Sequence, residues 1–363
     1  MDTTVPESAA EAHSSATLAL EKPHRDPGTP VKWYRCKIPR EQMSLLNRKS
    51  NLKAAGQTLG FLAILCATGT LFVWTCFHAP WFAPLALLLH GACCAFQINA
   101  VHELVHESVF KSSWQNRFFA GLFSFTGWYN HYAFWASHAE HHKFTLHPPD
   151  DQEVVLPQHA TVKAYLKLAV VDYMGVIYSI RDTWRTARGR VVGPWETHLY
   201  SNICPDQLKP VRRWAQFQII GHLAVGVAAI TTGYWPVWIA MSFGRFFGNG
   251  VFWLCNSAQH IGLVDNYPDF RVACRTIYLN PALQFLYWHM NYHTEHHMYA
   301  GVPCYNLGRL HRLIRHELPE PPRGLYRTWT HIAQILERQK REPTYQYFPA
   351  LPPPAAVAIP STA

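Results

Sequence analysis

The sequence predicts an all-α integral membrane protein with four transmembrane helices in two hairpins, joined to a cytosolic helical cap. Two observations lead to this prediction. First, the chain contains no Asp, Glu, Lys or Arg between Lys53 and Glu103. Second, residues 214–259 form another apolar block, interrupted only by Arg245. Because about 20 apolar residues cross a bilayer as a helix, each block is long enough for two crossings.

Turn-forming residues divide each block into a hairpin. Pro80 lies in the middle of the first block, and Gly233 and Pro236 lie within the second. Gly and Pro favour turns, so the chain is expected to reverse direction at these positions. The four predicted spans cover residues 56–77, 80–100, 214–233 and 236–256.

Basic residues predict the orientation in the membrane. The two predicted turns carry no Lys or Arg, whereas residues 35–53, residues 135–213 and the C-terminal third are rich in them. Since cytosolic loops carry an excess of Lys and Arg, both termini are expected in the cytosol. The net charge of +9 then reflects this topology and attraction to anionic lipids, and we expect no nucleic acid as a partner.

Composition divides the chain into three parts. Residues 1–31 are rich in Ser, Thr, Ala, Glu and Pro, and residues 343–363 are rich in Pro and Ala. Neither segment has a core-forming pattern, so both tails are predicted to be disordered. Residues 32–342 are expected to form one membrane domain.

Three histidine clusters, or boxes, point to the chemistry of the chain. The first runs from His102 to His106, and the HxxHH pattern occurs at residues 138–142 and again at residues 293–297. Histidines spaced by three or four residues share one face of a helix. Eight such histidines exceed the four ligands of a typical zinc site, so two metal ions are expected. Imidazole binds iron, copper and zinc, so spacing alone does not choose the metal.

The boxes are expected to meet at one face of the membrane. The first follows the second span, the second lies in the middle cytosolic segment, and the third follows the fourth span. In this order and spacing they resemble the membrane fatty acid desaturase and hydroxylase superfamily, over residues 50–325. The resemblance implies a centre of two iron ions that activates dioxygen and removes hydrogen from an unactivated alkyl chain. It also implies a separate electron donor, either a b-type cytochrome or a ferredoxin.

The same resemblance implies a ninth ligand in an Asn-x-x-x-His pattern, which Asn256 and His260 match, with Asn256 holding a water molecule. The metal ligands expected on this basis are His102, His106, His138, His141, His142, His260, His293, His296 and His297. For a eukaryotic chain, an endoplasmic reticulum location is implied.

Departures from the family pattern bear on the substrate. The third box begins with His293, where front-end desaturases have Gln, and Met298-Tyr299 replaces the Phe-Pro of acyl-CoA and sphingolipid members. The chain has no His-Pro-Gly-Gly motif of a fused cytochrome. We expect a fatty acyl substrate or a lipid-like metabolite, and desaturation, hydroxylation and acetylenation remain open.

Further residues near the boxes are expected to support the ligands, because metal-bound imidazoles usually donate their second N–H to a carboxylate or carbonyl. These residues are Asn256, His289, Glu140 and Glu295, although a glutamate there could also be a solvated flank. Arg245 lies near the middle of the fourth predicted span, where a charge is costly and usually functional. It is expected either to bind an acidic group of the substrate or to hydrogen-bond within the bundle.

Two other functions fit part of the pattern. His102, Glu103 and His106 match the HExxH motif of zinc metalloproteases, some of which are embedded in membranes. The metalloprotease hypothesis leaves both HxxHH triplets without a role. A divalent-metal transporter would place histidines along the spans, whereas the boxes lie at their ends.

Overall fold

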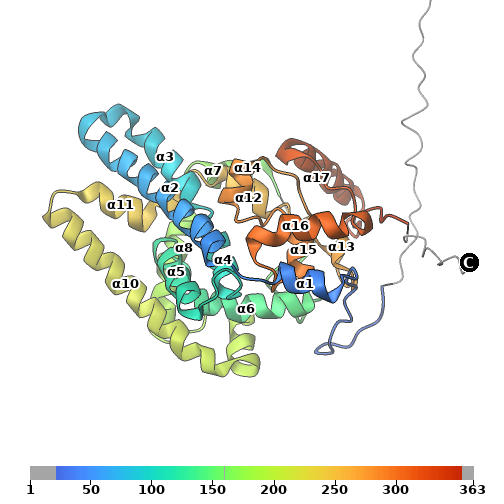
Figure 1. The fold of residues 1–363 in the computed structure, drawn as a ribbon. Coiled ribbons are helices and arrows are strands. Elements are labelled where there is room, and N and C mark those ends of the chain that lie inside the picture. The colour runs from blue at the N-terminus through green and yellow to red at the C-terminus, as the bar shows by residue number, and fades with distance from the viewer. Residues whose placement is uncertain (1–21, 159, 354–363) are drawn as a thin grey trace, which may run out of the picture.

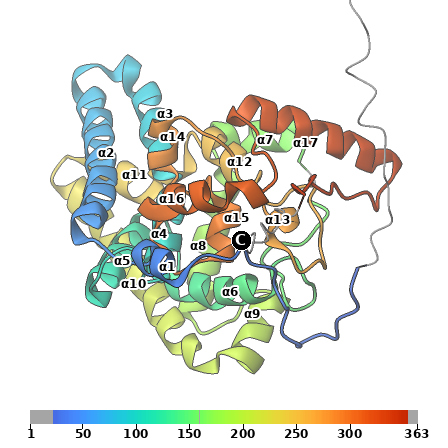
Figure 2. The same cartoon turned by 45° about the vertical axis from the view of Figure 1, so that its right-hand side comes forward.

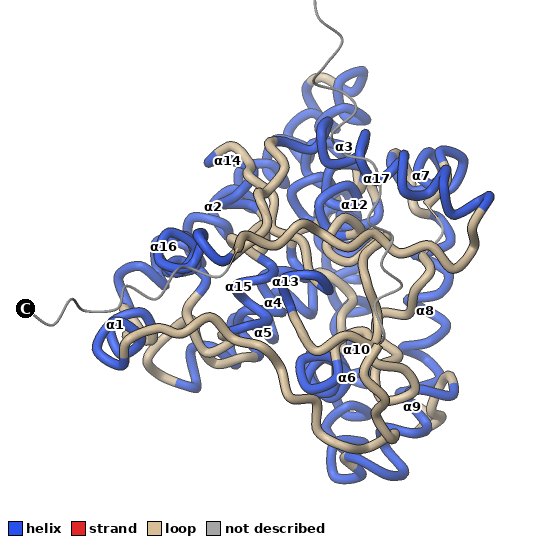
Figure 3. The backbone as a smooth tube through the Cα atoms, turned by 90° about the vertical axis from the view of Figure 1, so that its right-hand side faces the viewer, coloured by secondary structure: helices blue, strands red, loops and turns tan. Residues whose placement is uncertain are grey.

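The computed structural model describes residues 22–158 and 160–353, and this part of the chain is helical (Figure 1). Among these residues there is no β-strand, only isolated bridges such as that between Tyr34 and Asp269. Figure 3 accordingly shows helices joined by loops. The prediction of an all-α fold is confirmed.

The region of the first predicted hairpin contains α2 (Asn51–His78), the 3₁₀ turn η1 (Pro80–Phe82), α3 (Ala83–Cys94) and α4 (Gln97–Val105). Helices α2 and α3 pack side by side and project together at the upper left of Figure 1. Both Asn51–His78 and Pro80–Val105 are long and apolar enough to cross a membrane. The predicted spans 56–77 and 80–100 lie within these two segments.

The second predicted hairpin corresponds to α10 (Leu208–Thr231) and α11 (Trp235–Phe243), which contact each other. The chain reverses at Gly233, which has a φ of +80°. Glycine adopts such a conformation easily because it has no Cβ. The segment Pro205–Thr231 is the third membrane-spanning candidate among the described residues, and it overlaps most of the predicted span 214–233.

The region of the fourth predicted span, residues 236–256, is not one helix. It is divided into α11, the 3₁₀ turn η4 (Gly244–Phe246) and α12 (Gly250–Asn256). Neither α-helix reaches the ~20 residues that cross a bilayer. The segment that separates α11 from α12 packs closely on α3. A Cβ at Gly91 of α3 would lie only 2.3 Å from the carbonyl oxygen of Phe247.

The remaining helices form a cap away from the hairpin turns (Figure 2). Its helix α6 contacts α4 of the first hairpin, and within the cap α15 contacts both α13 and α16. The cap elements are α1 (Arg40–Leu46), α5 (Ser113–Thr126), α6 (His131–Phe144), α7 (Val162–Ala169), α8 (Tyr173–Ala187), α9 (Pro194–His198), η2 (Leu199–Ile203), η3 (Pro205–Gln207), α13 (Phe270–Ala273), α14 (Pro281–Leu286), α15 (His293–Met298), α16 (Cys304–Ile314), η5 (Arg315–Glu317) and α17 (Gly324–Arg341).

A buried aromatic cluster joins the first hairpin to the cap. Phe61 of α2 packs edge-to-face on Phe123 of α5 and on Trp288, with ring centroids 5.4 Å and 5.8 Å apart. All three side chains are fully buried. Because Trp288 lies five residues before the third histidine box, this contact fixes the position of that box relative to the first span.

The predicted disordered tails lie partly outside the described residues, namely at 1–21 and 354–363. The described remainder of both tails runs along the cap. Arg25 forms an ion pair with Asp150. In the C-terminal tail, the backbone N–H of Tyr347 donates to the carbonyl of Gly262 at 2.8 Å.

Candidate metal centre

Four segments bring the box histidines together inside the cap. The first box lies at the C-terminal end of α4, the second on α6 and the third on α15, and His260 lies in the turn that follows α12. Helix α6 begins where the sequence favours it, because the Asn130 side chain accepts a hydrogen bond from the Ala133 N–H at 3.2 Å. Its HxxHH histidines then share a face two to three turns further on.

Five histidines form the first group: His102, His106, His138, His142 and His296. One nitrogen from each lies within 4.8 Å of the corresponding nitrogen of the others. The Nε2 atoms of His142 and His138 are 2.9 Å apart, and those of His296 and His142 are 3.1 Å apart. Two nitrogens that bind one metal at about 2.1 Å lie about 3.0 Å apart at a right angle, so this spacing fits a shared ion.

A second group lies directly beside the first and consists of His260, Cys274, His293 and His297, all buried. The Nε2 atoms of His293 and His260 are 2.8 Å apart, and those of His297 and His293 are 3.1 Å apart. The two groups touch, because the ring of His142 stacks on that of His297 with centroids 4.4 Å apart. The arrangement provides for two neighbouring ions.

Hydrogen bonds at the far side of the rings orient the ligand nitrogens. Nδ1 of His138 lies 2.8 Å from Oε1 of Glu153, and Nδ1 of His260 lies 2.8 Å from the carbonyl oxygen of Ala273. A carboxylate or carbonyl oxygen only accepts, so Nδ1 carries the proton and Nε2 presents its lone pair. Lone pairs that converge on one point repel one another unless a cation lies between them. The convergence of these Nε2 lone pairs therefore fits bound metal ions.

His141 lies between the two groups without joining either set of closely spaced atoms. Its ring centroid is 5.3 Å from that of His260 and 4.9 Å from that of His297. Nδ1 donates to Oδ2 of Asp151 at 2.8 Å, which leaves Nε2 free for a metal. Of the nine predicted ligands, the structure therefore brings eight into two groups and places His141 against the second.

Burial and charge set the protonation of these side chains. Burial, reinforced by neighbouring imidazoles, holds the pKa of His138, His142 and His297 well below the ordinary value. Burial also lowers the pKa of His260 to about 3. At neutral pH these rings are therefore uncharged, and the neutral imidazole is the form that binds metals.

Two of the predicted supporting residues, Glu295 and Glu140, bond to side chains other than the box histidines. Glu295 contacts Nδ1 of His311 and accepts from the Thr276 hydroxyl at 2.5 Å, so it holds α15 in place without touching a ligand. Glu140 instead accepts from Lys143 at 2.6 Å. It contacts no box imidazole among the described residues.

The remaining two supporting residues also lie apart from the groups. Asn256 ends α12 one turn before His260, and its side chain makes no hydrogen bond within the described part of the chain. His289 bonds through Nδ1 to the Gln284 amide at 2.9 Å and belongs to neither group.

Arg245 is held inside the bundle. Its Nη1 donates to the Tyr129 hydroxyl at 2.5 Å and its Nη2 to the Ser179 hydroxyl at 3.2 Å. The guanidinium also lies over the rings of Tyr129 and Phe246, 4.5 Å from each centroid. Of the two predicted roles, the structure supplies the partners for hydrogen bonding within the protein.

Several residues of the site were not predicted. Asp151 and Glu153 orient His141 and His138, and the Thr145 hydroxyl lies 3.1 Å from Nδ1 of His297. The acidic run that follows the second box was the available signal for the first two. Cys274 gave no signal, because a single cysteine 14 residues after His260 matches no ligand spacing.

These features define a helical protein with three helices apolar enough to cross a membrane and two adjacent, histidine-rich groups that could each hold a metal ion. Residues 78–329, well over half of the chain, match the family described as fatty acid desaturase. The chain therefore belongs to the fatty acid desaturase family, and with its three apolar helices it is an integral membrane protein of an oxidoreductase family. The predicted family resemblance is confirmed. No curated protein matches the chain.

Proposed function

We propose that this protein is a dioxygen-dependent di-iron desaturase or hydroxylase that oxidises the alkyl chain of a fatty acyl substrate or a lipid-like metabolite. The observation that carries this proposal is the pair of adjacent groups of ligand nitrogens, which fits two metal ions side by side. Family membership supports iron as the metal and an alkyl chain as the substrate.

The proposed ligands divide between two iron ions. The first ion would be held by His102, His106, His138, His142 and His296. The second would be held by His141, His260, His293 and His297. Bound iron supplies the redox chemistry that reduces dioxygen and oxidises a C–H bond. The protein holds the imidazoles in one tautomer through Glu153, Asp151 and the Ala273 carbonyl, and the buried cap excludes bulk water.

We propose that the chain crosses the membrane four times, with both termini and the cap in the cytosol. The fourth crossing would be made by α11, η4 and α12 together, since α11 and α12 are each too short. The hairpin turns carry no Lys or Arg while the cap is rich in them, which supports this orientation. In a eukaryotic cell the membrane would be that of the endoplasmic reticulum.

Electrons would come from a separate b-type cytochrome or ferredoxin that docks near the second group. A cavity of about 520 Å³ is lined by Cys274 of that group and by Arg271, Arg323 and Arg327. One acidic side chain, Glu320, also lines it. Arg323 and Arg327 are exposed and form no ion pair among the described residues. A positive wall of this kind attracts an acidic partner and speeds its approach.

Charge reversal tests this docking site. The double substitution Arg323→Glu and Arg327→Glu should slow reduction by the protein donor while leaving reduction by dithionite unchanged. Arg338→Glu with Lys340→Glu, further along α17, is the control because it makes the same charge change away from the cavity. Equal slowing in both variants would remove the argument for this site.

The structure argues against the two rival functions. In an HExxH protease the glutamate acts on zinc-bound water, but Oε1 of Glu103 lies 3.1 Å from Nδ1 of its neighbour His102 and orients that ring. Catalytic zinc also uses three protein ligands, whereas five imidazoles meet here. A transporter needs ligands along the spans, and the two groups are built from helix ends and cap helices.

Metal analysis of the detergent-purified protein tests the proposal directly. We expect about two iron ions per chain, and a single zinc with little iron would support the protease instead. His296→Ala should abolish turnover while the protein stays in the membrane. His198→Ala is the control, because this exposed histidine bonds to Asn202 and belongs to neither group. Wild-type turnover in His296→Ala would overturn the assignment.

A further inference from the structure

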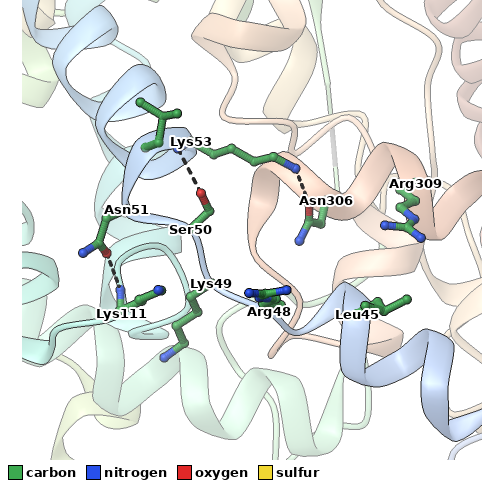
Figure 4. A pocket seen from close by; sticks show the side chains of 10 residues that line it. Leu45, Arg48, Lys49, Ser50, Asn51, Lys53, Lys111, Asn306 and Arg309 are labelled. Atoms are coloured by element: carbon green, nitrogen blue, oxygen red, sulfur yellow. Dashed lines mark hydrogen bonds between the residues drawn. The ribbon is translucent and has the colours of Figure 1, made fainter.

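A strongly basic cavity lies on the cytosolic side of the first proposed span, where α1, the start of α2 and α16 meet (Figure 4). Its volume is about 510 Å³, within the usual range of small-molecule sites. Half of its ten lining residues are basic and none is acidic; the basic ones are Arg48, Lys49, Lys53, Lys111 and Arg309.

These charges are not neutralised by carboxylates. Within residues 22–158 and 160–353, none of the five takes part in an ion pair. Lys49 donates to the Glu107 carbonyl at 2.6 Å and Lys53 to the Asn306 side-chain oxygen at 3.3 Å, both of which are neutral acceptors. The Glu107 carboxylate is itself paired with Arg117 at 2.8 Å. Five like charges around one cavity repel one another, so an anion bound there is stabilised.

The surroundings of the cavity indicate what kind of anion it binds. Asn51 is the first residue of α2, the first membrane-spanning candidate, so the cavity lies at the level of lipid headgroups. Leu52 and Leu45 line the same cavity and are 85% and 49% exposed. The helix N-terminus adds a partial positive charge. Basic side chains beside exposed leucines match a molecule with a charged head and apolar tails.

We propose that this cavity binds the phosphate headgroup of an anionic phospholipid of the cytosolic leaflet. Arg48, Lys111 and Arg309 would contact the phosphate, while Leu45 and Leu52 would contact the start of the acyl chains. The site is separate from the metal centre, but Lys49 links them, because it bonds to the carbonyl of Glu107, the residue directly after His106. A lipid bound there would hold the end of the first histidine box in place.

Photolabelling in lipid nanodiscs tests this proposal. The protein is placed in phosphatidylcholine that contains a small share of photoactivatable phosphatidic acid, and the labelled peptides are mapped. We expect labelling of the peptides that contain residues 45–53 and 306–309. In the triple variant Arg48→Gln, Lys111→Gln, Arg309→Gln, affinity should fall by roughly fivefold for each charge removed.

A matched control removes three exposed basic residues elsewhere on the cap: Lys163→Gln, Lys167→Gln, Arg190→Gln. This variant should be labelled like the wild type. Equal labelling of both triple variants, or equal labelling by a phosphatidylcholine probe, would overturn the proposal. Full displacement of the probe by glycerol 3-phosphate would also overturn it, since the site would then take a soluble phosphate ester.

A measurement on the unaltered protein covers the case in which the triple variant does not fold. Binding through phosphate contacts should weaken as salt is raised, because exposed charge pairs are screened. Labelling of residues 45–53 that is unaffected by salt would show that apolar contact alone holds the lipid. That result would contradict a phosphate site.

Discussion

Nδ1 of His141 lies 2.8 Å from Oδ2 of Asp151, and both side chains are buried. The same carboxylate accepts the backbone N–H groups of Leu146 at 2.8 Å and Glu153 at 2.9 Å, so its position is fixed from three sides. Burial lowers the pKa of His141, but the charge of Asp151, its hydrogen bond and the charge of Glu153 together outweigh that effect and leave the pKa raised. His141 is therefore the most basic imidazole beside the second group.

Asp151→Asn should weaken the second metal site. The amide removes the negative charge and can turn an N–H toward Nδ1, so the tautomer of His141 is no longer fixed. Loss of such an orienting carboxylate typically costs about 10-fold to 100-fold in metal affinity or activity. Iron content and turnover of the purified variant measure the effect.

Asp150→Asn is the matched control for this change. Asp150 neighbours Asp151 but pairs with Arg25 and the Gly28 N–H rather than with a histidine. It should keep wild-type iron and turnover. If Asp151→Asn behaves in the same way, His141 is not a ligand whose orientation matters.

His260 and Cys274 belong to the second group but to none of the three histidine boxes. Their substitution should have different effects on the metal content. His260→Ala should lower the metal content from about two ions to about one, because the Nε2 of His260 points at those of its neighbours and burial keeps the ring neutral. Cys274→Ala should keep both ions. Burial, together with the charge of Glu295, raises the pKa of the Cys274 thiol well above its ordinary value, so loss of its proton is unfavourable.

Metal analysis of both variants, with the retained iron followed by Mössbauer spectroscopy, separates these outcomes. A Cys274→Ala variant that holds one ion would make the thiolate a ligand and leave His141 in a supporting role. A His260→Ala variant that holds two ions would mean that its predicted role as ninth ligand is wrong.

The boxes could be predicted from sequence because ligand spacing on a helix is a local property. His102 and His106 share a face whatever surrounds them, and the same holds for residues 138–142 and 293–297. The apolar runs of α2 and α10 are equally local, since absence of charge over about 20 residues is sufficient. Local pattern thus accounts for the three segments that are long and apolar enough to cross a membrane and for the two box triplets.

The missed features depend on contacts between distant segments. Gly244, Gly248 and Gly250 were a local signal for the break between α11 and α12, but glycine is also frequent inside transmembrane helices. The close approach of Phe247 to Gly91 on α3 identifies the break. Likewise, Cys274 joins the second group only because α13 packs against α15. Glu140 was expected near the ligands because of its place in the box, but its position on the helix turns it toward Lys143.

Acid should destabilise the protein partly through His131, which lies outside the metal groups. This ring packs against Trp214 with centroids 4.4 Å apart, and burial lowers its pKa to about 4. In the unfolded chain the pKa is about 6.5, so the unfolded state gains a proton first as the pH falls. Stability is therefore complete above about pH 6.5 and is lost progressively down to about pH 4. At pH 5 the loss from this one group is about 2 kcal/mol.

Thermal unfolding of the detergent-solubilised protein at pH 7.5 and pH 5 measures this effect. His131→Gln cannot titrate, so the difference between its two melting temperatures should be smaller than in the wild type. His198→Gln, at an exposed site, should leave the difference unchanged. An unaltered difference in His131→Gln would mean that the ring is not held neutral by burial.

Arg245 should be important for stability rather than for substrate affinity. Its guanidinium bridges Tyr129, which lies between α5 and α6, and Ser179 of α8, so it ties the broken segment between α11 and α12 to the cap. Hydrogen bonds to a charged group contribute about 1.5–3 kcal/mol each, and Arg245→Lys cannot reproduce both because an ammonium lacks the planar fork. The expected result is a lower melting temperature with an unchanged KM for the alkyl substrate.

Arg190→Lys on the surface should change neither quantity. A raised KM with an unchanged melting temperature would instead favour binding of an acidic substrate group.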